Sequence, residues 1–189
     1  MKILIMVLSC IKPPYDRLYK TQLETFDSIE VDDVDTHFYF GDEYELMHVA
    51  FRNALNDIWQ KDWDIIFRTN SSSYINKRKL KEFLENKNGT IWIGDENGYN
   101  SGAGFIISRD LAKILMCELK DDKYPYEDLL CHKILESKGY LCQKGDKCIY
   151  DHNSKYFSNK YHIRVKPDVC DINRQMDIDA MRYIHSKLK

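Results

Sequence analysis

The chain alternates between short apolar runs and segments whose apolar residues recur at helical spacing. Residues 3–8 are almost continuously apolar, which is typical of a strand buried on both faces of a sheet. Residues 109–119 carry apolar side chains three and four positions apart, which predicts an amphipathic helix with Ser108 as its N-cap. The predicted strands are residues 3–8, 36–40, 64–68, 90–93 and 104–107. The predicted helices are residues 16–28, 43–61, 77–85, 109–119, 127–138 and 173–188.

This order of elements predicts the fold class. Strands that alternate with helices favour an α/β fold of the Rossmann-like kind, in which a mostly parallel central sheet is flanked by helices. Residues 142–175 are less regular, and a stretch of that length is more typical of a functional loop with short strands than of structureless chain. Because no repeat or linker divides the sequence, we expect one domain over residues 1–189.

Composition narrows the class of protein further. The 189 residues are 43% hydrophobic and 31% charged, as in a globular domain, and the net charge of −2 argues against a general nucleic-acid binder. The longest apolar run, 3–8, is too short to cross a bilayer and lacks the flanks of a signal peptide. The six cysteines form no C-x-x-C pair, so we expect reduced thiols rather than a zinc site. Together these features predict a cytoplasmic protein without a transmembrane segment.

A polar cluster follows the predicted strand 64–68 at once. Arg68-Thr69-Asn70-Ser71-Ser72-Ser73 stands where a strand of a parallel sheet would end, and ligands of α/β proteins bind at that edge. Short polar residues there suit a ribose, a phosphate or a metal ion. The same residues are also common in a turn that caps the next helix, and both interpretations stay open.

Two further stretches carry candidate chemistry. Gly102-Ala103-Gly104 could let the main chain approach a ligand closely or adopt positive φ, although an ordinary turn before a strand explains it nearly as well. The third glycine of a dinucleotide-binding loop is missing. Glu127 and Asp128 open a predicted helix, where acidic residues are favoured electrostatically even without a catalytic role.

Taken in order, four segments resemble the inverting GT-A glycosyltransferases of the beta-1,3-galactosyltransferase and Fringe type, and the compact viral and bacterial sugar transferases related to them. The first is a basic helix with Arg17 that leads to Thr25-Phe26, and the second is the run Arg68 to Asn76. The third matches Tyr-x-Ser-Gly-x-Gly-Tyr and Ser-x-Asp-Leu, as residues 99–105 and 108–111. The fourth is Glu127-Asp128-Leu129. The resemblance covers about residues 1–140 and implies an inverting transferase that moves a sugar from a nucleotide diphosphate, most often UDP, to a glycan or carrier-linked hydroxyl.

The resemblance also implies roles for individual residues. Asp128 would be the catalytic base that takes the proton of the acceptor hydroxyl, while the reacting sugar passes through an oxocarbenium-like transition state. Glu127 would be its partner or would contact the sugar. The carboxyl end of the first strand, at Ser9, would hold the nucleotide. The residues expected to bind the donor are Ser9, Cys10, Arg17, Asp42, Arg52, Arg68, Asn70, Ser71, Ser72, Gly102, Ala103, Gly104, Glu127, Arg164 and Lys166.

The sequence departs from the family at its metal site. The family's Asp-x-Asp motif binds Mn²⁺ or Mg²⁺, and here Asn70 and Ser72 stand in its place, without carboxylate charge. Three outcomes stay open. A metal could be held weakly by Asn70, Ser72 and a late histidine such as His162. It could instead be held by other ligands, such as Asp95. In the third outcome no metal binds, and the chain's own cations neutralise the diphosphate. On a strand, His162, Arg164 and Lys166 would share one face, as a diphosphate clamp or as a solvated edge.

Two other functions compete with sugar transfer. A degenerate domain that binds nucleotide or glycan without turnover would explain the missing carboxylates. A nucleotidyltransferase is less compatible with the sequence, since such enzymes use paired carboxylates for metal and residues 69–73 contain none. Trp92, Tyr99 and Tyr126 are candidates for stacking on a sugar ring, although most aromatic residues pack in cores.

Overall fold

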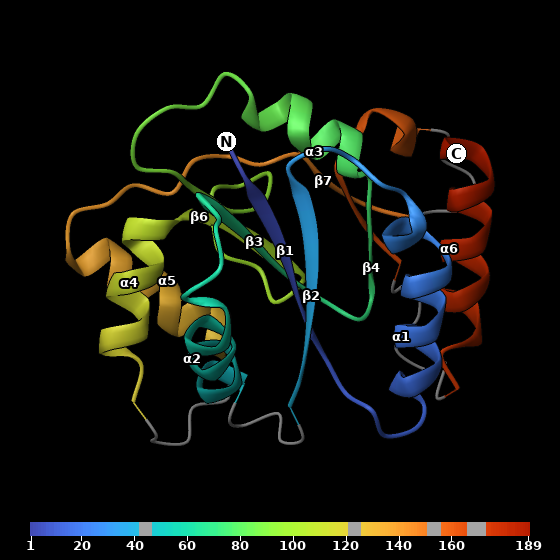
Figure 1. Ribbon diagram of the computed structural model, residues 1–189, viewed down its shortest axis with the longest axis horizontal. Helices are drawn as coiled ribbons and strands as arrows, with labels where there is room; N and C mark the ends of the chain where they lie inside the picture. The colour runs from blue at the N-terminus through green and yellow to red at the C-terminus, as the bar shows by residue number, and fades with distance from the viewer. Residues whose placement is uncertain (42–46, 121–125, 151–155, 166–172) are drawn as a thin grey trace.

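A five-stranded mixed sheet forms the centre of the computed structural model, which describes residues 1–41, 47–120, 126–150, 156–165 and 173–189 (Figure 1). Its strand order is β2-β1-β3-β6-β5, and a second sheet of three short strands has the order β4-β8-β7. The strands are β1 (Ile3–Ser9), β2 (Val34–Phe40), β3 (Ile65–Asn70), β4 (Ser73–Ile75), β5 (Trp92–Ile93), β6 (Gly104–Ser108), β7 (Lys147–Ile149) and β8 (His162–Arg164). The predicted α/β class with a central sheet between helices is confirmed.

The prediction of a mostly parallel sheet holds only in part, because the sheet is mixed. β1 is parallel to β2 and β3, but β6 is antiparallel to both β3 and β5. Parallel neighbours need a long crossover, which α1 and α2 provide for the first three strands. Residues 94–103 connect β5 to β6 without a helix, so the chain turns back and the two strands run in opposite directions.

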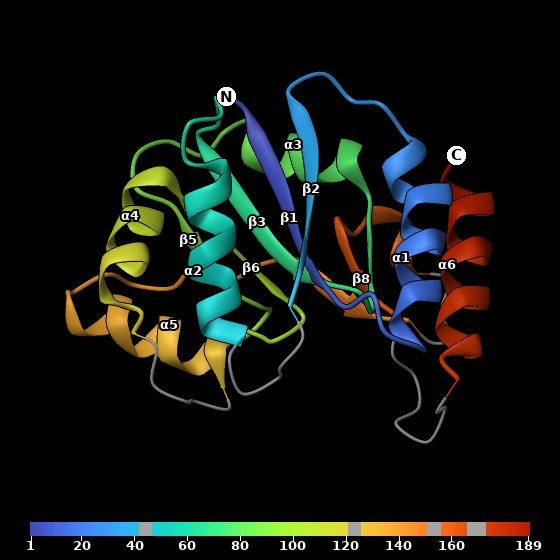
Figure 2. The same cartoon turned by 60° about the horizontal axis from the view of Figure 1, so that its bottom comes forward.

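Helices cover both faces of the central sheet (Figures 1 and 2). One face packs against α2, α4 and α5. The other face carries α1, α3, α6 and the small sheet, and α1 lies beside α6 in both views. The helices are α1 (Tyr15–Glu24), α2 (Met47–Ile58), α3 (Lys77–Leu84), α4 (Arg109–Glu118), α5 (Glu127–Ser137) and α6 (Gln175–Leu188), with short 3-10 turns at Phe26–Ser28 and Tyr156–Asn159.

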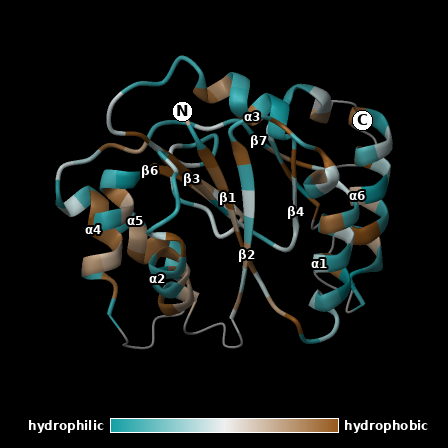
Figure 3. Cartoon of the chain, viewed as in Figure 1, coloured by the Kyte–Doolittle hydropathy of each residue, from teal (hydrophilic) through white to brown (hydrophobic). Residues whose placement is uncertain are grey.

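Strand β1, which lies between β2 and β3 in the sheet, contributes side chains to both halves of the core. Ile3, Ile5 and Val7 lie in the cluster on the α1 and α6 side, whereas Leu4 and Met6 pack among α2, α4 and α5. All seven residues of β1 are buried, as the continuous apolar run predicts. Figure 3 shows the same pattern, with hydrophobic colour along β1 and β3 and mixed colour on the helices around them.

The starts of two helices show how local sequence sets the element boundaries. Asn76 caps α3, because its side-chain oxygen accepts the main-chain N–H of Lys79 at 3.2 Å. Ser108 stands at the N-cap of α4 as predicted, but its hydroxyl does not cap the helix. It accepts the N–H of Ile91 at 3.0 Å and donates to the carboxylate of Asp110, so it ties the helix start to β5 instead.

Two findings concern the cysteines and the membrane prediction. The five cysteines within the described ranges are free thiols. Among the helices that the structure describes, none is long and apolar enough to cross a membrane.

Candidate functional site

The candidate residues of the sequence converge at the edge of the sheet where β1 and β3 end. Leu8 of β1 pairs with Asn70 of β3, so Ser9 ends the strand and Cys10 leaves the sheet beside the polar cluster. β6 runs the other way and begins at the same edge, where Gly104 pairs with Thr69. This edge lies at the bottom of Figure 1, where α1 and α2 begin. Three of the segments expected to form a site, the end of β1, the polar cluster and the glycine loop, therefore meet there.

An ion pair between Arg68 and Glu127 organises this edge. Both side chains are 3% exposed, and one guanidinium nitrogen contacts the Glu127 carboxylate while another donates to the main-chain oxygen of Gly102 at 2.8 Å. Burial raises the pKa of Glu127 to about 7, and the neighbouring guanidinium offsets part of that rise. Arg68 thereby fixes the start of α5 relative to the glycine loop.

Asp128 lies beside the glycine loop at the first turn of α5. A Cβ added at Gly102 would lie 3.6 Å from its carboxylate oxygen Oδ2. Unlike its neighbour Glu127, Asp128 is only half buried, so its carboxylate borders the protein surface. The main-chain oxygen of Asp128 accepts from the side chain of Asn100 at 3.3 Å, which also holds α5 to the loop. A carboxylate held in this way can accept a proton from a bound hydroxyl.

Asn70 and the serines form a turn that is bonded to itself. The Asn70 side-chain oxygen accepts from the N–H of Ser72 at 3.0 Å and from the hydroxyl of Ser73 at 3.3 Å, and its amide nitrogen donates to Gly102 at 2.6 Å. The buried side chain of Gln22 donates to the main-chain oxygens of Asn70 and Ser73. Asn70 is half buried, and the three serines are buried. The expected turn is present, and it is held rigidly.

Gly104 is required for packing rather than for positive φ. Neither Gly102 nor Gly104 is among the residues with positive φ in the described chain, so that expectation is wrong. A Cβ at Gly104 would lie 2.8 Å from the main-chain oxygen of Arg68 and 3.2 Å from the ring of His162. Ala103 between them is fully buried, and its main-chain oxygen accepts from Thr69 at 2.9 Å.

His162 is a buried neutral group. Its ring is 2% exposed, and its Nε2 lies 3.0 Å from the Ser73 hydroxyl. Burial, assisted by the nearby cations Lys147, Arg164 and Arg68, lowers the pKa of His162 to about 3. Since the ring is buried and its Nε2 is bonded to Ser73, His162 packs under the polar turn rather than facing a ligand.

The other residues expected to bind the sugar donor lie at varying positions around the polar turn. Arg17 is exposed on α1 and contacts the start of α6, while Arg52 donates to the main-chain oxygen of Leu119 at 2.9 Å and joins α2 to α4. Arg164 lies in β8 opposite Ser73, near the turn. Ser9 is buried, and Cys10 is half buried. Asp42 and Lys166 lie outside the described residues.

Two basic residues that no sequence motif indicates lie at this edge. Arg174 donates to the hydroxyl of Ser72 at 2.7 Å and forms an ion pair with Asp177. Lys147 donates to the hydroxyl of Ser101 at 3.2 Å and lies 3.5 Å from a carboxylate oxygen of Asp95. Both belong to irregular sequence without a motif, and only the fold brings them here.

The residues present do not fit a divalent cation at the Asp-x-Asp position. The oxygens of Asn70 and Ser72 already accept hydrogen bonds, and the donor to Ser72 is a guanidinium, whose charge repels a cation. Asp95 accepts two main-chain N–H groups and contacts Lys147. Over the described ranges, no group of three or more His, Cys, Asp or Glu residues could hold a metal.

The three aromatic side chains that are candidates for stacking on a sugar differ in how far they are exposed to solvent. Trp92 is 2% exposed and donates to Asn100 at 2.7 Å, so it is unavailable to a sugar. Tyr99 is 60% exposed and stacks on His132, with ring centroids 5.1 Å apart. Tyr126 is 56% exposed at the start of α5. Both tyrosine side chains are largely exposed, and Tyr126 lies two residues before Asp128.

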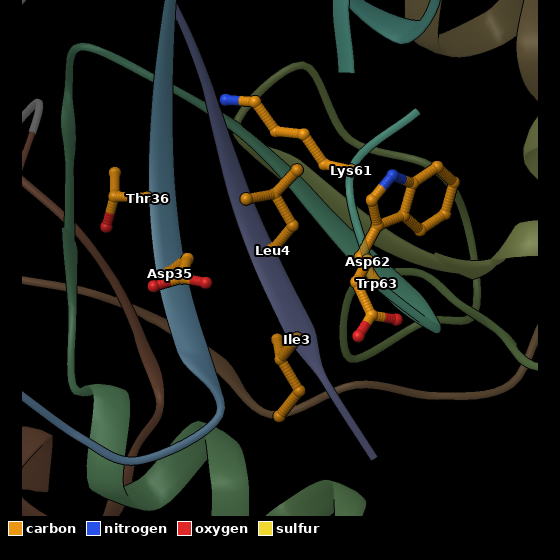
Figure 4. Close-up of a pocket in the computed structure, with 7 residues that line it drawn as sticks. All are labelled: Ile3, Leu4, Asp35, Thr36, Lys61, Asp62 and Trp63. Atoms are coloured by element: carbon orange, nitrogen blue, oxygen red, sulfur yellow. The ribbon is translucent and has the colours of Figure 1, made fainter. Parts of the chain in front are cut away.

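A surface hollow elsewhere has a different character (Figure 4). Its walls come from the first residues of β1 and β2 and from residues 61–63, at the opposite edge of the sheet. The Asp62 carboxylate beside it pairs with exposed Lys2. Its lining includes the polar residues Asp35, Thr36, Lys61 and Asp62 but none of the residues expected to form a site, so we assign the chemistry to the carboxyl edge.

Comparison with known proteins supports this fold assignment. The structure is similar to a solved one described as a glycosyltransferase involved in the glycosylation of the major capsid of PBCV-1, with a TM-score of 0.64. The match covers 96% of this chain and 100% of the other, at 14% sequence identity. The chain has the fold of a glycosyltransferase. No family model matches the sequence, and no curated protein matches it either.

Proposed function

We propose that this protein is an inverting glycosyltransferase of the GT-A type, which moves a sugar from a nucleotide diphosphate, most often UDP, to a glycan or carrier-linked hydroxyl. The observation that carries the proposal is the placement of the Asp128 carboxylate beside the glycine loop, at the end of the strands where α/β proteins bind ligands. The fold shared with a known glycosyltransferase supports it.

In the proposed reaction, Asp128 accepts the proton of the acceptor hydroxyl as that oxygen attacks the anomeric carbon. The bond from that carbon to the diphosphate breaks, and the nucleotide diphosphate leaves with the electron pair. Attack from the face opposite the leaving group inverts the anomeric centre. The ion pair of Arg68 and Glu127 holds Asp128 in position relative to the glycine loop. The exposed side chains of Tyr99 and Tyr126 suit contact with a sugar.

The first test needs no knowledge of the acceptor. The melting temperature is measured with UDP, GDP, CDP and their common sugars, each with Mn²⁺ and with chelator. We expect stabilisation by one nucleotide family, with UDP compounds the first choice, because a ligand that binds only the folded state raises its stability. A protein that responds to none of them would contradict a donor site.

The second test separates transfer from binding alone. Asp128→Asn should abolish transfer while donor affinity stays within about twofold, since the amide keeps the size of the side chain but cannot take a proton. Asp110→Asn is a matched control, because Asp110 also lies in the first turn of a helix, at the opposite edge of the sheet. Near-normal transfer by Asp128→Asn would refute its assignment as the base. A wild-type protein that binds donor and never turns it over would favour the degenerate binding domain.

A further inference from the structure

Arg174 occupies the position, relative to the polar turn, where the resemblance leads one to expect a metal ion. Its guanidinium donates to the Ser72 hydroxyl at 2.7 Å, and Ser72 stands at the second position of the Asp-x-Asp motif. The same guanidinium nitrogen, Nη2, also pairs with the carboxylate of Asp177. Arg174 is 6% exposed, so this positive charge lies almost out of solvent.

We propose that Arg174 replaces the divalent cation, and that its guanidinium binds the diphosphate of the sugar donor without a metal. The inference rests on the proposed function, since it names the group that neutralises the leaving diphosphate in that reaction.

The hydrogen bonding of Arg174 supports an anionic ligand. Its Nε–H is buried and meets no acceptor among the residues that the structure describes. A buried donor without an acceptor is costly, and such groups in native proteins are usually explained by a ligand, water or ion. A guanidinium presents planar N–H groups that match two phosphate oxygens at once. The residue also has a φ of 57°, a left-handed conformation uncommon for arginine.

Neighbouring cations make the same region attractive to an anion. Arg17 donates to the main-chain oxygen of Asn173 at 3.4 Å and to the side chain of Gln175, the two residues on either side of Arg174. Arg164 pairs across the small sheet with Ser73, one residue from Ser72. Fixed positive charge around a site repels Mn²⁺ and attracts a diphosphate.

A purely structural interpretation of Arg174 makes different predictions. On that view the guanidinium only joins α6 to the turn after β3, and its contacts with Ser72 and Asp177 are its whole function. Removing Asp177 would then harm the protein as much as removing Arg174. On the proposed view, Asp177→Asn leaves the guanidinium available and less neutralised, so anion binding is kept or strengthened.

The experiment measures binding of inorganic pyrophosphate and of UDP by calorimetry in excess EDTA, with the UDP measurement repeated in Mn²⁺. The variants are Asp177→Asn and the double change Arg174→Gln with Asp177→Asn, which removes both charges together and leaves no unpaired carboxylate. Arg174→Lys keeps the charge without the planar fork. Melting curves of each variant report folding.

The wild type should bind both ligands in EDTA, and Mn²⁺ should change the UDP affinity by no more than about twofold. The double variant should bind about tenfold to a hundredfold more weakly than Asp177→Asn, the loss expected for a hydrogen bond to a charged group. The lysine variant should lie between them. Binding of UDP only with Mn²⁺, or equal binding by the double variant and Asp177→Asn, would overturn the inference.

The outcome also separates this inference from the proposed function. Transfer that needs Mn²⁺ and ignores Arg174 would refute the inference and leave the glycosyltransferase proposal intact. Arg174-dependent binding of pyrophosphate, without turnover of any nucleotide sugar, would keep the anion site and refute the proposed activity. If the protein binds neither pyrophosphate nor UDP, both the inference and the proposed function are refuted.

Discussion

Arg68 and Glu127 form an ion pair in which each side chain is only 3% exposed, between the central strand β3 and the first turn of α5. The same guanidinium donates to the main-chain oxygen of Gly102. One buried contact therefore sets the distance between the strand end, the glycine loop and the helix that carries Asp128. The pair positions these three segments without adding much net stability. Removing two charges from water is unfavourable, and this desolvation cancels much of their mutual attraction.

Removing one partner of this pair should destabilise the protein strongly. Arg68→Met or Glu127→Met alone leaves a buried charge without its partner, and each should lower the free energy of unfolding by about 3–5 kcal/mol. The double variant should lose less than the sum of the two, because no uncompensated charge remains. Urea denaturation of the four proteins measures this. Additive losses would show that the two side chains do not stabilise one another.

The two glycines of the loop should respond differently to alanine. At Gly104 a methyl group would lie 2.8 Å from main-chain and ring atoms, so Gly104→Ala should lower stability by about 1–3 kcal/mol. At Gly102 the nearest atom is Oδ2 of Asp128 at 3.6 Å, an ordinary contact, so the fold should tolerate alanine within about 0.5 kcal/mol.

The activity of the same two variants provides the sharper comparison. The methyl group of Gly102→Ala would crowd and desolvate the Asp128 carboxylate, and transfer should fall about tenfold, equivalent to ~1.4 kcal/mol in the barrier. Melting curves and initial transfer rates measure both effects. Unchanged transfer by Gly102→Ala would argue that the acceptor hydroxyl does not approach Asp128 along this loop.

The buried ring of His162 should make the protein sensitive to acid. Its pKa falls from 6.5 in the unfolded chain to about 3 in the folded protein, mainly through burial. The unfolded state therefore takes up the proton first as pH falls. The stability that the neutral ring contributes is complete above pH 6.5 and is lost progressively down to pH 3, at about 1.4 kcal/mol per pH unit.

His162→Gln is a suitable comparison, because its amide can still bond to Ser73 and does not titrate. Between pH 7 and pH 5 the wild type should lose about 2 kcal/mol more stability than this variant. Glu127, whose pKa is raised to about 7, changes stability with the opposite sign between pH 4.5 and 7, and it contributes equally to both proteins. Parallel pH profiles would show that His162 is protonated as easily in the folded protein as in the unfolded one.

The sequence predicts most of the elements, and which segments meet at the candidate site, for a local reason. Apolar spacing within a segment determines where it forms a helix, so the expected helix at 109–119 agrees with α4 (Arg109–Glu118). The convergence of Asn70, Gly102 and Asp128 follows likewise from where strands and helices begin and end. The short strand β4 was missed because Ser73–Ile75 directly follows polar residues that also suit a turn.

Strand direction and the basic residues depend instead on contacts that no local pattern encodes. β6 is antiparallel to β5, and also to β3, because residues 94–103 bring the chain back from β5 without a helix, which the spacing of apolar residues does not reveal. Arg174 reaches Ser72 across 102 positions of sequence, and only the docking of α6 beside α1 brings it there. The same docking gives Ser72 a guanidinium partner, which its place in the metal motif does not indicate.

A carboxylate at position 72 should distinguish these two interpretations of the turn. If Ser72 belonged to a metal site, Ser72→Asp would restore one of the missing ligands, and UDP would bind more tightly in Mn²⁺ than it does to the wild type. With Arg174 2.7 Å from the Ser72 hydroxyl, we expect the opposite. The new carboxylate should pair with the guanidinium and compete with the diphosphate, so UDP affinity in EDTA should fall about tenfold, and Mn²⁺ should not restore it. Ser72→Asn, which has a similar size and no charge, should bind UDP more tightly than Ser72→Asp does. Mn²⁺-dependent tightening in the aspartate variant alone would show that a cation can displace Arg174 from the turn.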